Sequence, residues 1–215
     1  MKFIVALTAT AAVLSIVACG PSEAEIAATK AKATADSLAA VAAMEQTYTV
    51  DAANSKVMWA GTMVGVYTHT GTLNIVEGSI MTKGGQLTGG SFVVDMTTMA
   101  PSDTNYNTTD HTKDGLVGHL SSAEFFDVAG NPKAMLKITG VTGNTATADL
   151  TIRGKTNPEN ITDIVITPGE GGLMKATGKL VFDRQKYGVA WKATMKDMVL
   201  QDNIELTVEL VGKAQ

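Results

Sequence analysis

The chain has 215 residues and a formal net charge of −4; 45% of its residues are hydrophobic and 21 are glycine. The acidic balance argues against nucleic acid and anionic lipid headgroups as partners, because both need a concentrated basic face. The apolar content indicates a globular, β-rich domain and excludes a disordered chain. The single cysteine excludes an intrachain disulfide.

Residues 1–18 have the features of a secretory signal peptide. A cationic start precedes an apolar run over residues 3–17, and the small residue Ala18 stands just before Cys19. The apolar run is shorter than the roughly 20 residues that a membrane-spanning helix needs. The sequence alone therefore predicts an exported protein.

Cys19 is the predicted site of lipidation. The tetrapeptide Ile-Val-Ala-Cys that ends at Cys19 resembles the bacterial lipobox, in which the cysteine is acylated and the signal is cut in front of it. Two or more acyl chains suffice for stable membrane anchoring. Gly20, in place of aspartate, favours the outer membrane, facing the periplasm. The alternative is an ordinary signal peptide with an incidental cysteine.

Residues 19–46 form the lipidated N-terminus and an Ala-rich linker. Ser22 and Glu25 match the spacing of a capping box, which predicts the start of a helix there. Two interpretations remain open for this segment. One is a partly helical spacer, and the other is a disordered tether, because such a helix could bury little apolar surface.

Residues 47–213 form one predicted β domain in which apolar and polar residues alternate. Eight segments show the pattern of strands: residues 57–63, 71–76, 91–96, 134–139, 148–153, 161–167, 174–182 and 204–211. Glycine pairs at 84–85, 89–90 and 171–172 indicate turns. Only residues 111–126 leave room for a helix between strands, which argues against a parallel βαβ fold. Eight antiparallel strands predict a barrel or a sandwich.

Four segments, in this order, carry a family resemblance. They are residues 48–59 with 68–73, residues 119–128, residues 149–156, and residues 182–189 with 202–206. The second segment is the most specific, and its characteristic residues are His119, Leu120, Phe125, Phe126 and Asp127. Together the segments resemble the YceI-like family of exported, lipocalin-like lipid-binding proteins.

This resemblance implies a fold and a function. The family fold is an eight-stranded antiparallel barrel whose apolar tunnel holds a polyisoprenoid chain, in some members with a quinone-like group. It therefore implies a barrel and not a sandwich, and a non-enzymatic protein that binds, transports or stores a long-chain lipid. No separate cofactor is expected, and the resemblance is compatible with a homodimer.

The predicted walls of the lumen are apolar and adaptable. Methionine is frequent in the β domain, and its flexible side chain suits promiscuous apolar binding surfaces. The candidate pocket residues are Trp59, Phe92, Val94, Met96, Met135, Met174, Ala176, Gly178, Leu180, Phe182, Leu206 and Val208. Alternatively, these residues fill a solid core, and the protein is an envelope stress-protection or protein-interaction module with no ligand in the lumen.

No catalytic or metal-binding motif is recognisable. His69, His111 and His119 match no metal-ligand spacing, and we expect His119 to make a structural hydrogen bond to the backbone. Residues 103–110 resemble the opening of a calcium loop, but an Asx-rich surface turn is the better interpretation. The arginine-aspartate pair that many relatives carry before the His-Leu dipeptide is missing, which leaves headgroup recognition open.

Overall fold

The computed structural model describes residues 21–193 and 198–215. The predicted signal peptide and Cys19 lie outside the described residues. The chain divides into an N-terminal unit that ends at Val41 and a second unit, Ala42–Gln215, that contains the sheet. Each unit is described by itself.

The Ala-rich segment forms the helix α1 (Glu23–Ala43). The backbone N–H of Ser22 donates to Glu25 Oε2 at 2.7 Å, and the N–H of Glu25 donates to Ser22 Oγ at 3.3 Å. The predicted capping box is therefore confirmed. Of the two interpretations left open for this segment, the structure shows the helix. None of the described helices is long and apolar enough to cross a membrane.

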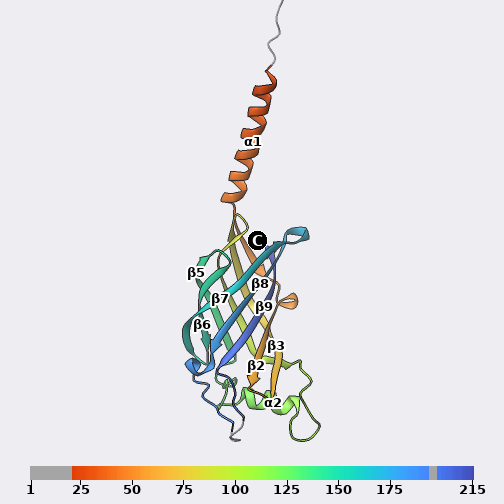
Figure 1. The fold of residues 1–215 in the computed structure, drawn as a ribbon, viewed down its shortest axis with the longest axis vertical. Coiled ribbons are helices and arrows are strands. Elements are labelled where there is room, and N and C mark those ends of the chain that lie inside the picture. Colours follow the sequence, from red (N-terminus) through yellow and green to blue (C-terminus); the bar gives the residue numbers. More distant parts are fainter. Residues whose placement is uncertain (1–20, 194–197) are drawn as a thin grey trace, which may run out of the picture. The chain divides into compact units, whose positions relative to one another are not determined.

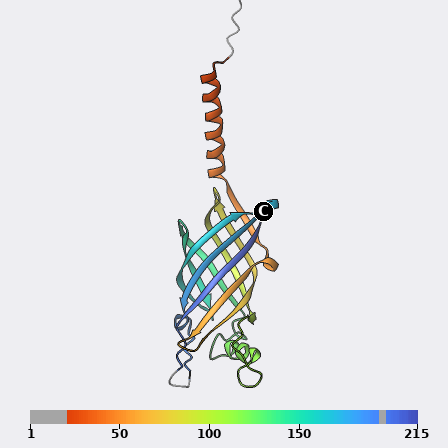
Figure 2. The ribbon, with the colours of Figure 1, turned by 45° about the vertical axis from the view of Figure 1, so that its right-hand side comes forward.

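Nine described strands form one antiparallel sheet that closes on itself (Figures 1 and 2). From β2 to β9 each strand pairs with the next strand in the chain, the pairing of β2 with β9 closes the circle, and β1 pairs with β3 and β9. The strands are β1 (Glu45–Val50), β2 (Lys56–Met63), β3 (Tyr67–Lys83), β4 (Gln86–Pro101), β5 (Lys133–Thr142), β6 (Thr145–Ile152), β7 (Lys155–Pro168), β8 (Leu173–Asp183) and β9 (Asn203–Ala214).

Strands β1 and β2 together fill a single strand position of the barrel. β1 pairs with residues 79–83 of β3 and 212–214 of β9, whereas β2 pairs with residues 67–74 and 205–209 of the same two strands. The short helix η1 (Ala52–Asn54) separates them, and the Asp51 carboxylate caps it by accepting the N–H of Ala53 at 3.0 Å. The predicted eight-stranded barrel is therefore confirmed, with one of its strands in two parts.

Strands β3 and β4 are much longer than the predicted segments 71–76 and 91–96. Register shifts between β3 and β4, such as the one between Ile75 and Glu77, interrupt the alternation on which the prediction depended. The turn predicted at Gly89 and Gly90 was wrong, because both residues lie buried within β4. A Cβ atom at Gly90 would lie 2.7 Å from the carbonyl oxygen of Ser79, so close strand pairing explains this glycine.

The two ends of the barrel differ. At the end where β1 begins, the β3–β4 turn has positive φ at Gly84 and Gly85, as predicted. At the opposite end lies the helix α2 (Lys113–Ser121), within the region where the sequence left room for a helix (Figure 1). The short helices η2 (Glu170–Gly172) and η3 (Arg184–Tyr187) lie at the first and second end, respectively.

Arg153 joins three of the segments that carry the family resemblance at the α2 end. It occupies the left-handed region (φ 51°) in the two-residue turn between β6 and β7. Its Nη1 donates to the carbonyl of Gly188 at 2.7 Å, and its Nη2 donates to the carbonyl of Ala123 at 3.1 Å. These charge-assisted bonds hold the α2 segment against the loop that follows β8.

Arg184 fixes that loop in turn. Its side chain is only 2% exposed, and its Nη2 contacts the carboxylate of Asp202 at 2.9 Å. Its Nη1 donates to the carbonyls of Val189 and Trp191 at 2.7 and 2.9 Å. The buried guanidinium thus meets its acceptors on the backbone and on Asp202, which places Trp191 beside α2.

Candidate functional site

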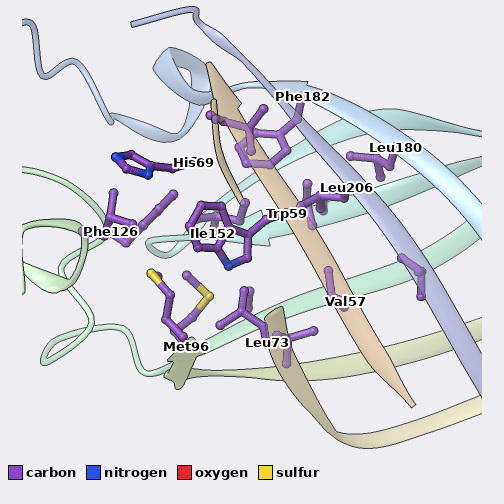
Figure 3. Close-up of a pocket in the computed structure, with 18 of the residues that line it drawn as sticks. Val57, Trp59, His69, Leu73, Met96, Phe126, Ile152, Leu180, Phe182 and Leu206 are labelled. Carbon is purple, nitrogen blue, oxygen red and sulfur yellow. The ribbon is translucent and has the colours of Figure 1, made fainter. Parts of the chain in front are cut away.

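The barrel encloses a cavity of about 510 Å³ (Figure 3). Side chains from β2 to β9 form its wall, and almost all of them are aliphatic, aromatic or methionine. The volume lies within the range of about 300–1,000 Å³ that is typical of sites for small molecules. The lumen is therefore a space that an apolar ligand can fill and not a solid core.

The alternation along β8 shows how the sequence builds this wall. Met174, Ala176, Gly178, Leu180 and Phe182 are all buried, and the residues between them are exposed. A period of two places such residues on one face of a strand. Ala176 and Gly178 border the cavity, and their small size leaves space open along this strand.

Most of the predicted pocket residues border the cavity. Those on the inward face of their strands are Trp59, Phe92, Val94, Met96, Ala176, Gly178, Leu180, Phe182, Leu206 and Val208. Further residues that strand periodicity could have identified include Leu73, Ile75, Leu150, Ile152 and Ile204. Figure 3 shows Trp59, Leu73, Met96, Ile152 and Leu206 around the same space.

Two of the predicted pocket residues, Met174 and Met135, are placed differently from the others. Met174 is 1% exposed but does not border the cavity, because it packs near Gly212 towards the end of the barrel where β1 lies. Met135 borders the cavity, yet it is 49% exposed and alternates with the more buried Ala134 and Leu136. We therefore place the side chain of Met135 on the outer face of β5.

The most specific family segment closes the cavity at the α2 end. His119, Leu120, Phe125 and Phe126 border the cavity. The His119 ring lies 4.8 Å from the ring of Trp191 and 5.4 Å from that of Phe125, both in edge-on arrangements. These rings form an aromatic cluster between the helix and the loop that Arg184 holds.

Asp127, in the same segment, has a structural role. It lies in the left-handed region (φ 49°), and its carboxylate accepts the Asn131 side-chain N–H at 3.0 Å. Asp127 does not border the cavity, so the segment combines wall residues with a turn that positions them.

Two buried polar atoms on the cavity wall have no hydrogen-bond partner among the described residues. They are Nε1 of Trp59 and Nε2 of His119. The hydrogen bond to the backbone that we expected from the His119 ring is therefore not made by Nε2. The sequence does not predict that these two atoms lack a partner within the described structure, because hydrogen-bond partners from distant parts of the chain are set only by the folded structure.

A polar cluster of His69, Asp103, Tyr106 and His111 lies at the α2 end of the lumen. His69 Nδ1 lies 3.2 Å from both oxygens of the Asp103 carboxylate, and His69 Nε2 lies 3.1 Å from Nε2 of His111. The Tyr106 hydroxyl donates to Asp103 Oδ2 at 2.8 Å. His69 and His111 border the cavity, so this cluster brings polar groups to an otherwise apolar wall.

Burial and hydrogen bonding set the charge of this polar cluster. Burial lowers the pKa of His69, and the Asp103 carboxylate opposes this only in part. Burial alone would raise the pKa of Asp103, but hydrogen bonds from the Thr70 and Asn105 backbone, Tyr106 and His69 hold it well below its ordinary value. Burial and the Asp103 carboxylate raise the pKa of Tyr106. At neutral pH Asp103 is thus charged, whereas His69 and Tyr106 are neutral.

This distribution of charge fixes the direction of the hydrogen bonds. An ionised Asp103 can only accept, so His69 donates to it from Nδ1 and carries a free lone pair on Nε2. His111 then donates its Nε2 proton to that lone pair. Two fully protonated rings could not keep this contact, because both facing nitrogens would be donors.

The polar cluster was not predicted from the sequence. Residues 103–110 were interpreted as a surface turn, which is correct for Asn107, whose side-chain oxygen accepts the N–H groups of Thr109, Asp110 and His111. The turn is also present at Asp103, whose carboxylate accepts the Asn105 N–H at 3.0 Å, but its side chain is only 9% exposed and lies beside His69. Within the described ranges, no group of three or more His, Cys, Asp or Glu residues could hold a metal ion.

Glu159 is a buried acidic residue whose carboxylate has partners on the loop that follows β8. It is 8% exposed, and its carboxylate accepts the hydroxyl of Tyr187 at 3.0 Å. Lys186 Nζ lies 3.5 Å from the same oxygen. Burial and the Glu159 carboxylate raise the pKa of Tyr187, so the hydroxyl remains a donor. The buried charge is thus satisfied, and this pair belongs to the framework outside the cavity wall.

Comparison with known proteins agrees with the barrel. The crystal structure of BcnA from Burkholderia cenocepacia superposes with a TM-score of 0.58 at 19% sequence identity, covering 75% of this chain and 98% of that one. A polyisoprenoid-binding domain from Saccharophagus degradans, implicated in plant cell wall breakdown, gives 0.53 at 12% identity, covering 78% and 98%. No curated protein sequence matches the chain. The model of the YceI-like domain matches residues 48–212, and the chain therefore belongs to the YceI-like domain family.

Proposed function

We propose that this protein binds a polyisoprenoid or another long-chain lipid in the barrel lumen and transports or stores it, without catalysis, at the cell envelope. The observation that carries the proposal is the enclosed cavity of about 510 Å³ with its apolar wall. Each methylene group buried there contributes about 0.8 kcal/mol, less the cost of ordering the chain. A protein-interaction module without a ligand in the lumen would need no such space.

The family comparison supports the choice of ligand. The Saccharophagus degradans domain with the same fold is described as polyisoprenoid-binding. The wall of the present barrel contributes the flexible side chains of Met63, Met96, Met99 and Met198, which adapt to a branched chain. An isoprenoid therefore fits both the shape and the chemistry of the lumen.

We also propose that Cys19 anchors the protein in the outer membrane, facing the periplasm. The Ala-rich helix α1 follows Cys19 closely in the sequence and precedes the barrel. Acyl chains on Cys19 would keep the barrel beside a membrane that can supply its ligand. The lipobox sequence supports this part of the proposal.

Native mass spectrometry of the full-length protein tests the binding proposal. The protein is extracted from membranes, stripped of lipid with organic solvent, refolded and incubated with geranylgeraniol or a longer polyprenol. We expect one ligand mass per barrel, and organic extracts of freshly purified protein should contain a long-chain lipid. A folded barrel that takes up no polyprenol and releases no lipid would refute the proposal.

A further inference from the structure

Two polar atoms on the cavity wall, Trp59 Nε1 and His119 Nε2, stand out because most of that wall is apolar and neither atom is paired within the described part of the chain. Both are buried and lack a hydrogen-bond partner among the described residues. Buried polar groups in folded proteins are nearly always paired, since an unpaired donor loses its bond to water without replacing it. Two such atoms facing one cavity point to a ligand that supplies the missing partners.

The position of the Trp59 indole is fixed by its surroundings. Trp59 lies on β2 opposite Gly71 of β3 and Leu206 of β9. A Cβ atom at Gly71 would lie 2.3 Å from Cζ2 and 2.5 Å from Cε2 of the indole, so the ring rests directly on the glycine backbone. The ring cannot move outward, and its N–H stays on the lumen side of the wall among the apolar residues of Figure 3.

The chemistry of the indole defines the partner. An indole N–H is a donor only, so its partner must be an acceptor. The plain hydrocarbon part of a lipid offers none of comparable strength. The fitting partner is an oxygen atom carried by the chain, at the depth of Trp59.

The charges around the lumen show that this oxygen is neutral. The only lysine or arginine that borders the cavity within the described part of the chain is Lys179. Its side chain is 62% exposed and lies 3.1 Å from the carboxylate of Asp163, on the outside of the barrel. A carboxylate or phosphate inside the lumen would therefore meet no lysine or arginine, among the described residues, to balance its charge.

We propose that Trp59 Nε1 forms a specific subsite for an uncharged oxygen acceptor, so the lumen selects long-chain lipids that carry a ketone, ester, ether or hydroxyl oxygen over plain hydrocarbons. This inference rests on the proposed function, because it concerns a ligand inside the barrel. His119 Nε2 provides a second polar contact, at the α2 end of the same cavity.

A matched pair of ligands tests the Trp59 subsite in the delipidated full-length protein. One is farnesylacetone, an isoprenoid methyl ketone, and the other is the hydrocarbon with a methylene group in place of the carbonyl. We expect the ketone to bind about three- to tenfold more tightly, as one net neutral hydrogen bond implies. In the Trp59→Phe variant the ratio of the two affinities should fall to about one, whatever happens to each affinity separately.

Indole NMR signals give an independent measure that does not depend on the variant folding well. The protein has two tryptophans, and Trp191 also borders the cavity, so the Trp59 signal in the ketone complex is compared with the same signal in the hydrocarbon complex. The ketone should move the Trp59 indole proton downfield, and the hydrocarbon should not.

Equal affinities for the two ligands, with the same Trp59 signal in both complexes, would overturn the oxygen subsite and leave lipid binding intact. Binding of neither ligand would overturn both proposals.

Discussion

Gly71 shows how a single residue determines the shape of the lumen. The side chain of any other residue would collide with the Trp59 indole and with the carbonyl of Ala100, which lies 2.6 Å from the Cβ position. We expect Gly71→Ala to lower the free energy of unfolding by about 1–3 kcal/mol, the usual cost of overpacking. Urea unfolding followed by circular dichroism measures this change.

Gly61→Ala is the matched control for Gly71→Ala. Gly61 lies on β2, and its added Cβ would meet only Ile204 Cδ1, at an ordinary 3.7 Å. It should change the free energy of unfolding by less than about 1 kcal/mol. Equal losses in the two variants would show that the Trp59 indole does not rest on Gly71 as described.

His69 makes the stability of the barrel depend on pH. Its pKa is lowered in the folded protein by burial, so the unfolded chain binds a proton more readily than the folded one. Well above about pH 6.5, His69 is neutral in both the folded and the unfolded state. As the pH is lowered below this value, the unfolded chain takes up the proton first and the free energy of unfolding decreases. Urea unfolding at about pH 7.5 and 5.5 should show this loss.

The variant His69→Gln isolates the contribution of His69, because glutamine keeps a polar side chain but does not titrate. Its free energy of unfolding should fall less between the two pH values than that of the wild type, even if it starts lower. An unchanged pH dependence would mean that protonation of His69 is not linked to unfolding.

At the scale of single residues, the apolar wall was predictable and the polar cluster was not. Alternation along a strand places Leu180 and Phe182 on the same inward face whatever the register of the neighbouring strands. The contact between His69 and Asp103, by contrast, joins residues 34 positions apart. It depends on where β3 and β4 end relative to each other, which the register shifts between these strands determine.

Among the elements, the turn between β6 and β7 holds the α2 end of the barrel together. The variant Arg153→Asn keeps a residue type that tolerates the left-handed conformation but removes the bonds to Gly188 and Ala123. We expect the free energy of unfolding to fall by at most about 1.5–3 kcal/mol for each charge-assisted bond removed, because water replaces part of each bond. Hydrogen exchange should become faster in residues 119–128.

Exchange in β1 and the adjoining part of β9, at the other end of the barrel, is the internal control for Arg153→Asn. These strands do not contact the turn and should keep their protection. A uniform increase along the whole barrel would indicate global destabilisation and contradict the local role of Arg153.

The elements themselves were predictable to different degrees. The capping box at Ser22 and Glu25 marked the start of α1 because both partners lie within one turn of a helix. The division of one barrel position between β1 and β2 was not predictable, because it depends on pairing with β3 and β9 far along the chain. The strand ends of β3 and β4 were missed because bulges conceal the alternation.

For the whole molecule, filling the lumen should abolish ligand loading. Gly178 faces the cavity, and a side chain there first meets Ile161 Cγ2, 3.2 Å from the Cβ position. We expect Gly178→Leu to occupy the lumen and to reduce the amount of bound polyprenol at least severalfold, because the leucine takes the volume that the chain needs. Native mass spectrometry of the full-length variant measures the loading.

Val181→Leu is the matched control, since Val181 lies on the same strand, faces outward and is 49% exposed. It should load as the wild type does. Normal loading of a folded Gly178→Leu barrel would contradict the proposal that the ligand lies in the lumen, and Ala176→Leu gives a second test on the same strand.

The opposite positions of the first strand and of α2 have a mechanical consequence for the barrel. Glu45, where β1 begins, pairs with Lys83 beside the β3–β4 turn, and α2 lies at the other end. A force applied to the chain at Glu45 along the strand direction loads β1 in shear. The hydrogen bonds that pair β1 with β3 and β9 then resist the force simultaneously. The polar cluster and α2 lie outside this path of force. Tension on the linker would therefore reach the barrel far from the end where its histidines meet the lumen.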